Sequence, residues 1–287
     1  MAAPTGPTVR RMQLGWELKR LRERCGFTLA EAVSGLTFSV SKLHRVENGL
    51  TALPKVADLR MLLERYGVDD EEDIAFLVET HRDSLNRGWW AQYRSTMPSG
   101  MAMYVGLESG AHSIRAWQPS VVLGLLQTER YARELFTTAK PVHETTTEFV
   151  ERGIQLRIER KQILTRREKP TKLWAILDEA VLRRVVGGHD VMREQYEEII
   201  RLAALDHVTV QILPLDAVTY RSASNFTLLE FTTPLPTVVQ SDGLDGSNVN
   251  DKDVTVWAFS RQFDALRAGA LAPSETPKFL HRLAREM

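Results

Sequence analysis

The sequence predicts a multi-domain protein in which an all-α domain of about five helices precedes an α+β domain with a small sheet. Three observations support this prediction. From residue 9 to residue 80, apolar residues recur at helical spacing with capping residues between them. After Pro170 the chain contains short segments rich in β-branched residues, each bounded by turn residues. Helical segments alternate with these short strands, which is typical of an α+β domain.

Residues 9–80 are predicted to form the first domain, and local signals mark each helix. The first helix runs from about residue 8 to 24 and ends before Gly26, a residue common at helix C-termini. Thr28 opens the second helix as part of a capping box, and Ser39 is the expected N-cap of the third. The fourth and fifth helices are expected after Pro54 and after the acidic run 69–73.

The rest of the chain is predicted to form a connector at 81–100 and a second domain at 101–287. The connector contains the words Gly88-Trp89-Trp90 and Pro98-Ser99-Gly100, which mark a hinge region. A sheet of about four strands is expected from the segments 172–177, 208–213, 226–231 and 237–240. Helices are expected at about 101–116, 128–138, 144–168, 179–186, 190–205, 252–268 and 275–285.

Composition and charge restrict the classes of protein to consider. Cys25 is the only cysteine in the sequence, so an internal disulfide is impossible and a reducing cytosol suits the chain. No apolar run approaches the roughly 18–20 residues that span a bilayer, and residues 1–8 read as a short tail without the features of a signal peptide. Residues 1–66 contain eleven Lys and Arg but six Asp and Glu, so they are basic. The remaining residues contain 26 Lys and Arg and 31 Asp and Glu, so they are mildly acidic. We therefore expect a cytoplasmic protein whose basic N-terminal part binds a polyanion.

The second and third predicted helices fit a helix-turn-helix. This interpretation depends on three short sequence motifs and one proline at characteristic spacing: Leu18 to Glu23, Thr28 to Glu31, Ser39 to Gly49, and Pro54. Through them residues 14–67 resemble the xenobiotic-response-element, lambda-repressor-like family. The resemblance implies that the third helix enters the major groove of double-stranded DNA. The expected DNA-binding residues are Thr28, Ser39, Val40, Ser41, Lys42, His44, Arg45 and Asn48.

Each of these residues has a chemical reason to contact DNA. By the resemblance, Val40, Ser41 and Arg45 occupy base-reading positions: a guanidinium can bind guanine bidentately, and an aliphatic side chain can contact a thymine methyl. Lys42 and His44 suit phosphate contacts equally well. Amides at the helix starts near Thr28 and Ser39 would add neutral phosphate contacts. The alternative is that these side chains form only a solvated helix face.

The helix-turn-helix departs from the family pattern at two places. Thr37 stands where the family usually has Gly, and a β-branched residue is poor at positive φ, so we expect the turn to bend at Gly35 instead. Ala32-Val33 replaces the usual Leu-Ala pair of the second helix, which puts a bulkier side chain where the two helices cross. Either change can alter the helix angle and hence the register on DNA.

A second set of sequence motifs lies beyond residue 85: Trp89-Trp90 and the segments 104–111, 124–132, 157–164, 177–184 and 210–214. In that order they resemble the C-terminal domain of the actinobacterial WhiJ-like regulators. The resemblance implies a small acidic partner protein, often encoded nearby, in arrangements likened to toxin–antitoxin pairs. The chain departs from this pattern at Leu123, where Pro is usual, and at 238–242, which lacks a Glu after the strand.

Candidate residues for a partner or effector in the second domain are Glu108, Trp117, Gln127, Tyr131, Arg157 and Arg160. Structural alternatives stay open for them. Glu108 can be a buried charge paired with Arg115 or Arg157. Arg152, Arg157, Arg160 and Lys161 can form a solvated, self-paired helix face, and Asp178 is a helix N-cap more readily than half of a catalytic dyad. The five tryptophans at 89, 90, 117, 174 and 257 are expected in the core.

The leading hypothesis is a homodimeric, sequence-specific transcriptional regulator whose C-terminal domain receives a signal or binds the acidic partner. The alternative is an antitoxin-like module that sequesters a protein and binds DNA mainly for autoregulation. An enzyme is not expected, because the seven histidines are scattered and no zinc, phosphate-loop or dinucleotide motif is present. No cofactor or metal is therefore expected.

Overall fold

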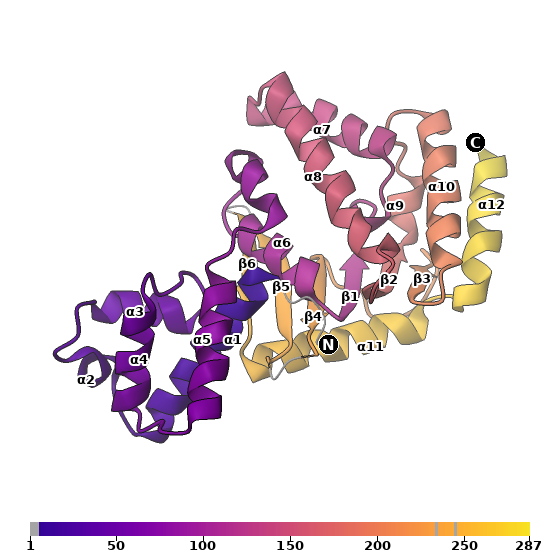
Figure 1. Cartoon of the computed structure of the whole chain (residues 1–287). Helices are drawn as coiled ribbons and strands as arrows, with labels where there is room; N and C mark the ends of the chain where they lie inside the picture. Colours follow the sequence, from indigo (N-terminus) through magenta and orange to yellow (C-terminus); the bar gives the residue numbers. More distant parts are fainter. Residues whose placement is uncertain (1–5, 233–234, 244–245) are drawn as a thin grey trace. The chain divides into compact units, whose positions relative to one another are not determined.

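The computed structural model describes residues 6–232, 235–243 and 246–287, so residues 1–5 of the expected N-terminal tail lie outside it (Figure 1). The chain divides into two compact units. The first contains the residues up to Ala91 together with Thr232 and Leu235, and the second contains Gln92–Phe231 and the residues from Pro236 onward. Residues 81–100, the expected connector, contain the end of one helix and the 3-10 helix η1 (Trp89–Thr96).

The first unit is a bundle of helices, as the apolar periodicity predicts. Its helices are α1 (Pro7–Arg24), α2 (Leu29–Val33), α3 (Val40–Glu47), α4 (Val56–Arg65) and α5 (Glu71–Ser84). The predicted capping residues are confirmed. The Thr28 hydroxyl accepts from the Glu31 amide at 3.2 Å, and the Ser39 hydroxyl accepts from the Lys42 amide at 3.2 Å. These bonds satisfy amides that lack acceptors inside the helix.

Leucines from all the longer helices fill the core of the first unit. Leu14 and Leu18 of α1, Leu43 of α3 and Leu59 and Leu62 of α4 are almost completely buried. Each such side chain contributes about 1.5–3 kcal/mol by leaving water. The core therefore holds α1, α3 and α4 together from sequence positions far apart.

The second unit contains a sheet with helices on both sides (Figure 1). Its helices are α6 (Met101–Gly110), η2 (Gly124–Leu126), α7 (Glu129–His143), α8 (Thr147–Thr165), α9 (Glu179–Arg183), α10 (His189–Ala203), α11 (Asp253–Gly269), η3 (Pro273–Glu275) and α12 (Thr276–Glu286). α11 packs on β1, β3, β4 and β5, whereas α8 and α10 lie on the other side of the sheet. This arrangement explains why β2, β3 and β4 are buried over most of their length.

The sheet is mixed, with the strand order β3-β2-β1-β4-β5-β6 among the described residues. The strands are β1 (Ser113–Gln118), β2 (Lys172–Asp178), β3 (Val208–Leu213), β4 (Phe226–Glu230), β5 (Val238–Gly243) and β6 (Gly246–Asn250). β1, β2 and β3 are parallel, and β4, β5 and β6 continue from β1 as antiparallel neighbours. One face carries Trp117, Ile176 and Phe226, which pack with Phe263 and Leu266 of α11.

The α+β prediction is confirmed, but two strands differ from the expectation. The predicted helix at 101–116 is wrong past Gly110, because the chain becomes extended at Ala111 and forms β1. β1 has six residues, Ser-Ile-Arg-Ala-Trp-Gln, and so short a mixture of apolar and polar residues has no clear period that separates a strand from the end of the preceding helix. β6 was not expected, since Gly, Ser and Asn have low strand propensity, and its pairing with β5 supplies what its sequence does not signal.

One core prediction is wrong: Trp257 on α11 is 61% exposed, whereas Trp117 is fully buried. Trp257 lies on the outer side of the helix, where the Arg261 guanidinium stacks over its ring at 4.8 Å.

No helix of the described residues has the length and apolar composition to cross a bilayer.

Candidate nucleic-acid interface

The turn between α2 and α3 forms at a glycine. Gly35 has φ +73°, and Thr37 is not among the described non-glycine residues with positive φ. The expected bend at Gly35 is therefore confirmed. The Thr37 hydroxyl has another role here: it donates to Asp58 Oδ1 of α4 at 3.4 Å, a long contact that links the turn to the helix behind it.

A buried ion pair attaches α3 to α1. Arg22 Nε and Nη2 donate to the two carboxylate oxygens of Glu47 at 2.7 and 2.9 Å, and Nη1 donates to the Phe27 carbonyl at 2.7 Å. Only 10% of the Arg22 side chain and 3% of the Glu47 side chain are exposed. The hydrogen bond to Glu47 raises the pKa of Arg22, so this guanidinium stays charged. The bidentate geometry fixes both the position and the rotation of α3.

A glycine inside α1 permits the close approach that this ion pair needs. A Cβ on Gly15 would stand 2.2 Å from the carbonyl oxygen of Val46, at the end of α3. Any other residue would therefore push the two helices apart. Sequence reasoning missed Gly15, Arg22 and Glu47 as positioning residues. The available signal was a glycine in an apolar helical pattern and an acid at an inward position of the third helix.

α2 is held from its C-terminal end by α4. The Arg65 guanidinium donates to the carbonyls of Glu31 and Ala32 at 3.1 and 2.9 Å. α2 has five residues, so most of its carbonyls have no amide partner within the helix. Arg65 donates to two of these carbonyls, of which that of Glu31 also accepts from the Ser34 amide, and it joins α2 to the rest of the bundle.

The outward face of α3 contains the predicted DNA-binding residues. Leu43 and Val46 point into the core, whereas the side chains of Val40, Ser41, His44, Arg45 and Asn48 are exposed and Lys42 is half-buried. Thr28 and Ser39 are exposed at the starts of α2 and α3. The structure thus brings the residues expected from α3 together on one side of that helix.

Some of these residues already have partners. Asn48 Nδ2 donates to the His44 carbonyl at 2.7 Å, so this side chain caps α3 at its C-terminus. The hydroxyls of Thr28 and Ser39 are engaged in capping, which leaves their helix starts to act through backbone amides. In the described part of the chain, Arg45 has no ion pair or side-chain hydrogen bond. Its guanidinium is available for an external acceptor.

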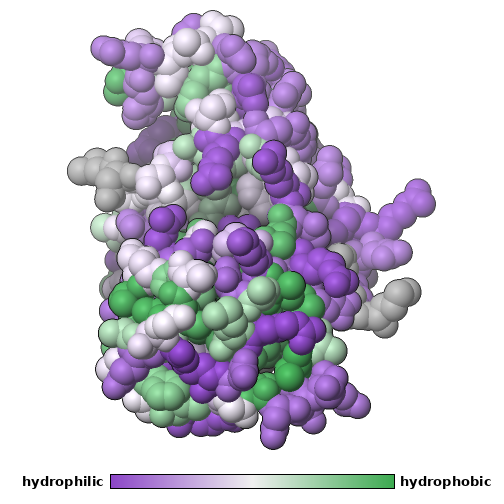
Figure 2. All heavy atoms as spheres, turned by 60° about the vertical axis from the view of Figure 1, so that its left-hand side comes forward, coloured by the Kyte–Doolittle hydropathy of each residue, from purple (hydrophilic) through white to green (hydrophobic). Residues whose placement is uncertain are grey.

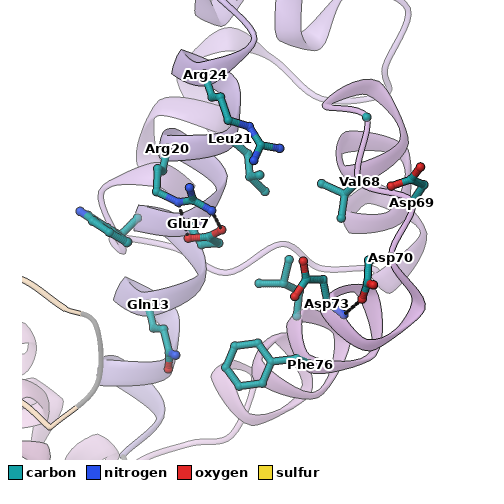
Figure 3. A pocket seen from close by; sticks show the side chains of 13 residues that line it. Gln13, Glu17, Arg20, Leu21, Arg24, Val68, Asp69, Asp70, Asp73 and Phe76 are labelled. Carbon is teal, nitrogen blue, oxygen red and sulfur yellow. Dashed lines mark hydrogen bonds and ion pairs between the residues drawn. The ribbon is translucent and has the colours of Figure 1, made fainter.

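The first unit also has a cleft of about 410 Å³, between α1 and the start of α5 (Figure 3). Arg20 and Arg24 approach it from α1, and Asp69, Asp70 and Asp73 approach it from the opposite side. Three carboxylates repel phosphate, so this cleft does not suit a nucleic-acid backbone. The DNA-binding candidate is therefore the exposed side of α3.

Hydrophobic side chains lie among hydrophilic ones on the face that Figure 2 presents. The large exposed apolar side chains of the first unit are Val40, Leu50, Val56, Met61, Phe76 and Leu85. Val40 is the one that belongs to α3, which is consistent with an apolar contact to a base.

Glu108 of the second unit is a buried charge, but its partner differs from the expectation. Arg160 Nε and Nη2 donate to its two carboxylate oxygens at 2.7 and 2.8 Å, whereas Arg115 pairs with Glu230 at 2.8 Å. Tyr104 donates to Glu108 Oε1 at 2.7 Å, and burial raises the pKa of this phenol. The pairing with Arg115 or Arg157 is wrong because α8 directs Arg160, not Arg157, at α6.

The other second-domain candidates are also placed by the structure. Arg157 Nη1 donates to Gln127 Oε1 at 2.7 Å, and Gln127 Nε2 donates to the Val122 carbonyl at 2.6 Å. The Tyr131 hydroxyl accepts from the Val122 amide at 3.4 Å. These residues lie near Glu108 and Arg160, whereas Trp117 lies on the sheet face under α11. Most of these side chains are buried within the unit.

The remaining structural expectations concern charges. Asp178 is the N-cap of α9, because its Oδ1 accepts from the Ala180 amide at 2.9 Å. On α8, Arg152 pairs with Glu148 of the same helix, whereas Lys161 pairs with Glu198 of α10 and Arg160 is buried against Glu108 of α6. The expected solvated, self-paired face is therefore wrong for Arg160 and Lys161, whose partners lie on other helices. Within residues 6–232, 235–243 and 246–287, no cluster of three or more His, Cys, Asp or Glu side chains could hold a metal.

Comparison with known protein families gives two matches. The profile of a family described as a helix-turn-helix domain matches residues 13–76. The profile of a family described as a domain of unknown function, DUF5753, matches residues 101–282. Neither the curated proteins nor the solved structures contain a match to the chain.

Proposed function

Because this chain belongs to the DUF5753 family and carries a helix-turn-helix domain ahead of that region, we propose that it is a sequence-specific transcriptional regulator of the xenobiotic-response-element type. The observation that carries the proposal is the exposed face of α3, which is fixed from behind by Arg22 and Glu47. A rigid scaffold behind an exposed polar and cationic face is what base reading needs.

α3 fits the major groove in size and chemistry. An α-helix with its side chains is about 10–12 Å across, close to the groove width of about 12 Å. The eight residues of α3 extend about 12 Å, or roughly two turns. Arg45 binds a guanine, Ser41 exchanges a hydrogen bond with a base, and Val40 contacts a thymine methyl. Lys42 and His44 hold phosphates on either side. Amides at the starts of α2 and α3 bind phosphate without a net charge.

We further propose that the protein acts as a cytoplasmic homodimer. One helix-turn-helix makes few base contacts, and two half-sites about 34–36 Å apart would supply the missing specificity. The second domain then provides dimerisation, signal reception or both, and the resemblance to actinobacterial WhiJ-like regulators implies a small acidic partner protein. A signal that prefers the DNA-free form must weaken DNA binding by its differential affinity for the two forms. The absence of enzymatic activity stays a prediction.

The antitoxin-like alternative has less support. It needs cations on α8 that are free to meet an acidic partner, but Arg160 is buried against Glu108 and Lys161 pairs with Glu198. Capture of a small acidic protein that persists after DNase treatment would favour this alternative over the regulator.

The test of the proposed function is selection of genomic DNA fragments by the purified full chain at one fixed, near-physiological salt concentration. The expected result is enrichment of a short pseudo-palindrome. Arg45→Ala should lose this enrichment, and Arg24→Ala is the matched control, since Arg24 faces the acidic cleft. Binding that is uniform across sequences, or enrichment unaffected by Arg45→Ala, would contradict the proposal.

A further inference from the structure

Two guanidiniums of α8, those of Arg157 and Arg160, lie near the carboxylate of Glu108 in the second unit. Both oxygens of Glu108 accept hydrogen bonds from Arg160. Arg157 lies three residues earlier on the same helix, and among the described residues its side-chain acceptor is the neutral amide oxygen of Gln127 alone. The pair of arginines therefore has a surplus of one positive charge.

The surplus charge is poorly compensated. Arg157 Nε is a buried nitrogen without a hydrogen-bond partner in the described residues. Burial, followed by repulsion from Arg160, lowers the pKa of Arg157 to about 10. The ring of Phe136, 5.3 Å from the guanidinium, offers a weak attraction only. A buried cation of this kind calls for a counter-charge.

Both guanidiniums are directed at one open position beside Gly124. A Cβ built on Gly124 would lie 3.6 Å from Arg157 Nη1 and 3.7 Å from Arg160 Nη1, and no heavy atom would be nearer. A methyl group would therefore fit in ordinary van der Waals contact with both nitrogens, and glycine leaves this side of the two guanidiniums without a side chain. Gly124 and Arg157 are half-buried, so the position is not sealed from solvent.

This geometry gives a structural role to residues of the motif Gly124-Leu-Leu-Gln-Thr128. Gly124 keeps the position open, and Gln127 orients Arg157 while its own amide is anchored to the Val122 carbonyl. Lys161 donates to the Gln127 carbonyl at 3.0 Å and fixes the end of the segment. The loop is therefore held rigidly beside the two guanidiniums.

We propose that Gly124, Arg157 and Arg160 form a binding site for a small oxoanion, the phosphate or carboxylate group of a small molecule. One oxygen of the anion lies against this uncovered side of Gly124, at van der Waals distance from its Cα, and accepts from both Nη1 groups. Guanidiniums suit this role, because they present several donors in a fixed plane. The proposal does not depend on DNA binding, and it assigns the second domain a ligand class.

The test uses the full chain without DNA, so its outcome is independent of the proposed regulatory function. Thermal unfolding is followed while inorganic phosphate or acetate is added, with sodium chloride at equal ionic strength as reference. Phosphate or acetate should raise the unfolding midpoint progressively beyond the chloride reference, because a ligand of the folded form stabilises it. Isothermal titration calorimetry gives the affinity directly.

Two variants locate the site, and a third is the control. Gly124→Ala should fold normally, because its Cβ meets other atoms at ordinary van der Waals distances, but the methyl would crowd an oxygen that approaches both Nη1 groups from this side. Arg157→Met removes the surplus charge. Each should weaken anion binding by about tenfold or more, the loss of one charge-assisted contact. Arg130→Met removes an exposed arginine paired with Glu194 and should bind as the unmodified chain does.

The proposal is overturned if neither anion shifts the midpoint beyond chloride, which would mean that water alone solvates Arg157. The proposal is also overturned if phosphate or acetate raises the unfolding midpoints of Gly124→Ala and Arg130→Met by the same amount. Gly124→Ala keeps the test decisive even if Arg157→Met fails to fold.

Discussion

Replacement of Glu47 by Gln should destabilise the first unit strongly. The carboxylate accepts two hydrogen bonds from Arg22 inside the bundle, and the amide can accept one of them while its NH₂ group faces a donor. The change leaves the Arg22 charge without its counter-ion. Removal of one member of a buried ion pair costs about 3–5 kcal/mol.

Because Arg22 keeps other contacts, the expected loss in the free energy of unfolding lies near the lower end of this range, at about 3 kcal/mol. Arg22 keeps its bond to the Phe27 carbonyl, and 10% of its side chain reaches solvent. The free energy of unfolding of a domain is about 5–15 kcal/mol, so this loss is a fifth or more of the total. α3 should therefore lose its fixed position more often than any other part of the first unit.

The assay is amide hydrogen exchange of the two units, followed separately, because a two-unit chain need not unfold in one step. Glu23→Gln is the matched control: Glu23 lies 3.5 Å from the same Arg22, but 56% of its side chain is exposed. This control should cost less than about 1 kcal/mol. Equal protection of α1 and α3 in Glu47→Gln and Glu23→Gln would refute the reasoning.

Four further outcomes are expected. Arg45→Ala should lower specific DNA affinity by about 1–3 kcal/mol and relax preference at one base pair, as measured by fluorescence anisotropy on single-base variants. Lys42→Ala should weaken all sequences alike and reduce the slope of log affinity against log salt by about one. Gly15→Ala puts a Cβ 2.2 Å from an α3 carbonyl oxygen, so both the unfolding midpoint and the DNA affinity should fall. The pKa of Glu31 is lowered because its carboxylate accepts from the Thr28 amide and hydroxyl. This capping interaction therefore stabilises the fold above the unfolded-state pKa and is lost as pH falls through the lower folded-state pKa, which carboxyl NMR titration measures.

Each of these four predictions has its own control variant or its own contrary result. Arg24→Ala should leave both base preference and salt slope nearly unchanged, and an Arg45→Ala protein that discriminates as before would show that α3 does not read bases. Unchanged helix packing in Gly15→Ala would mean that α1 and α3 tolerate a wider separation. Glu31→Gln keeps an acceptor without a titrating group, so its stability should lose the corresponding pH dependence.

Features set by neighbouring residues were predictable from the sequence. Thr28, Ser39 and Asp178 cap helices through bonds to amides two or three residues away, so the local sequence contains both partners. Gly35 replaces the missing glycine of the turn for an equally local reason. The exposed face of α3 follows from helical periodicity alone.

Features set by distant residues were not predictable in the same way. Glu108 and Arg160 are 52 positions apart, and nothing in the local sequence selects Arg160 over Arg115 or Arg157. β1 and β6 exist because β2, β4 and β5 pair with them. The roles expected for individual DNA-binding and partner-binding residues stay predictions, since they concern molecules outside the chain.

The attachment of α2 through Arg65 has a consequence for protein engineering. A five-residue helix is shorter than the length at which an isolated helix persists in water. A peptide that copies only α2, the turn and α3 should therefore be unstructured, and a graft of this motif onto another scaffold must also carry the α4 arginine. Retargeting to another DNA sequence should be easier, because the exposed side chains of α3 can be exchanged while Arg65 and its carbonyl acceptors stay untouched.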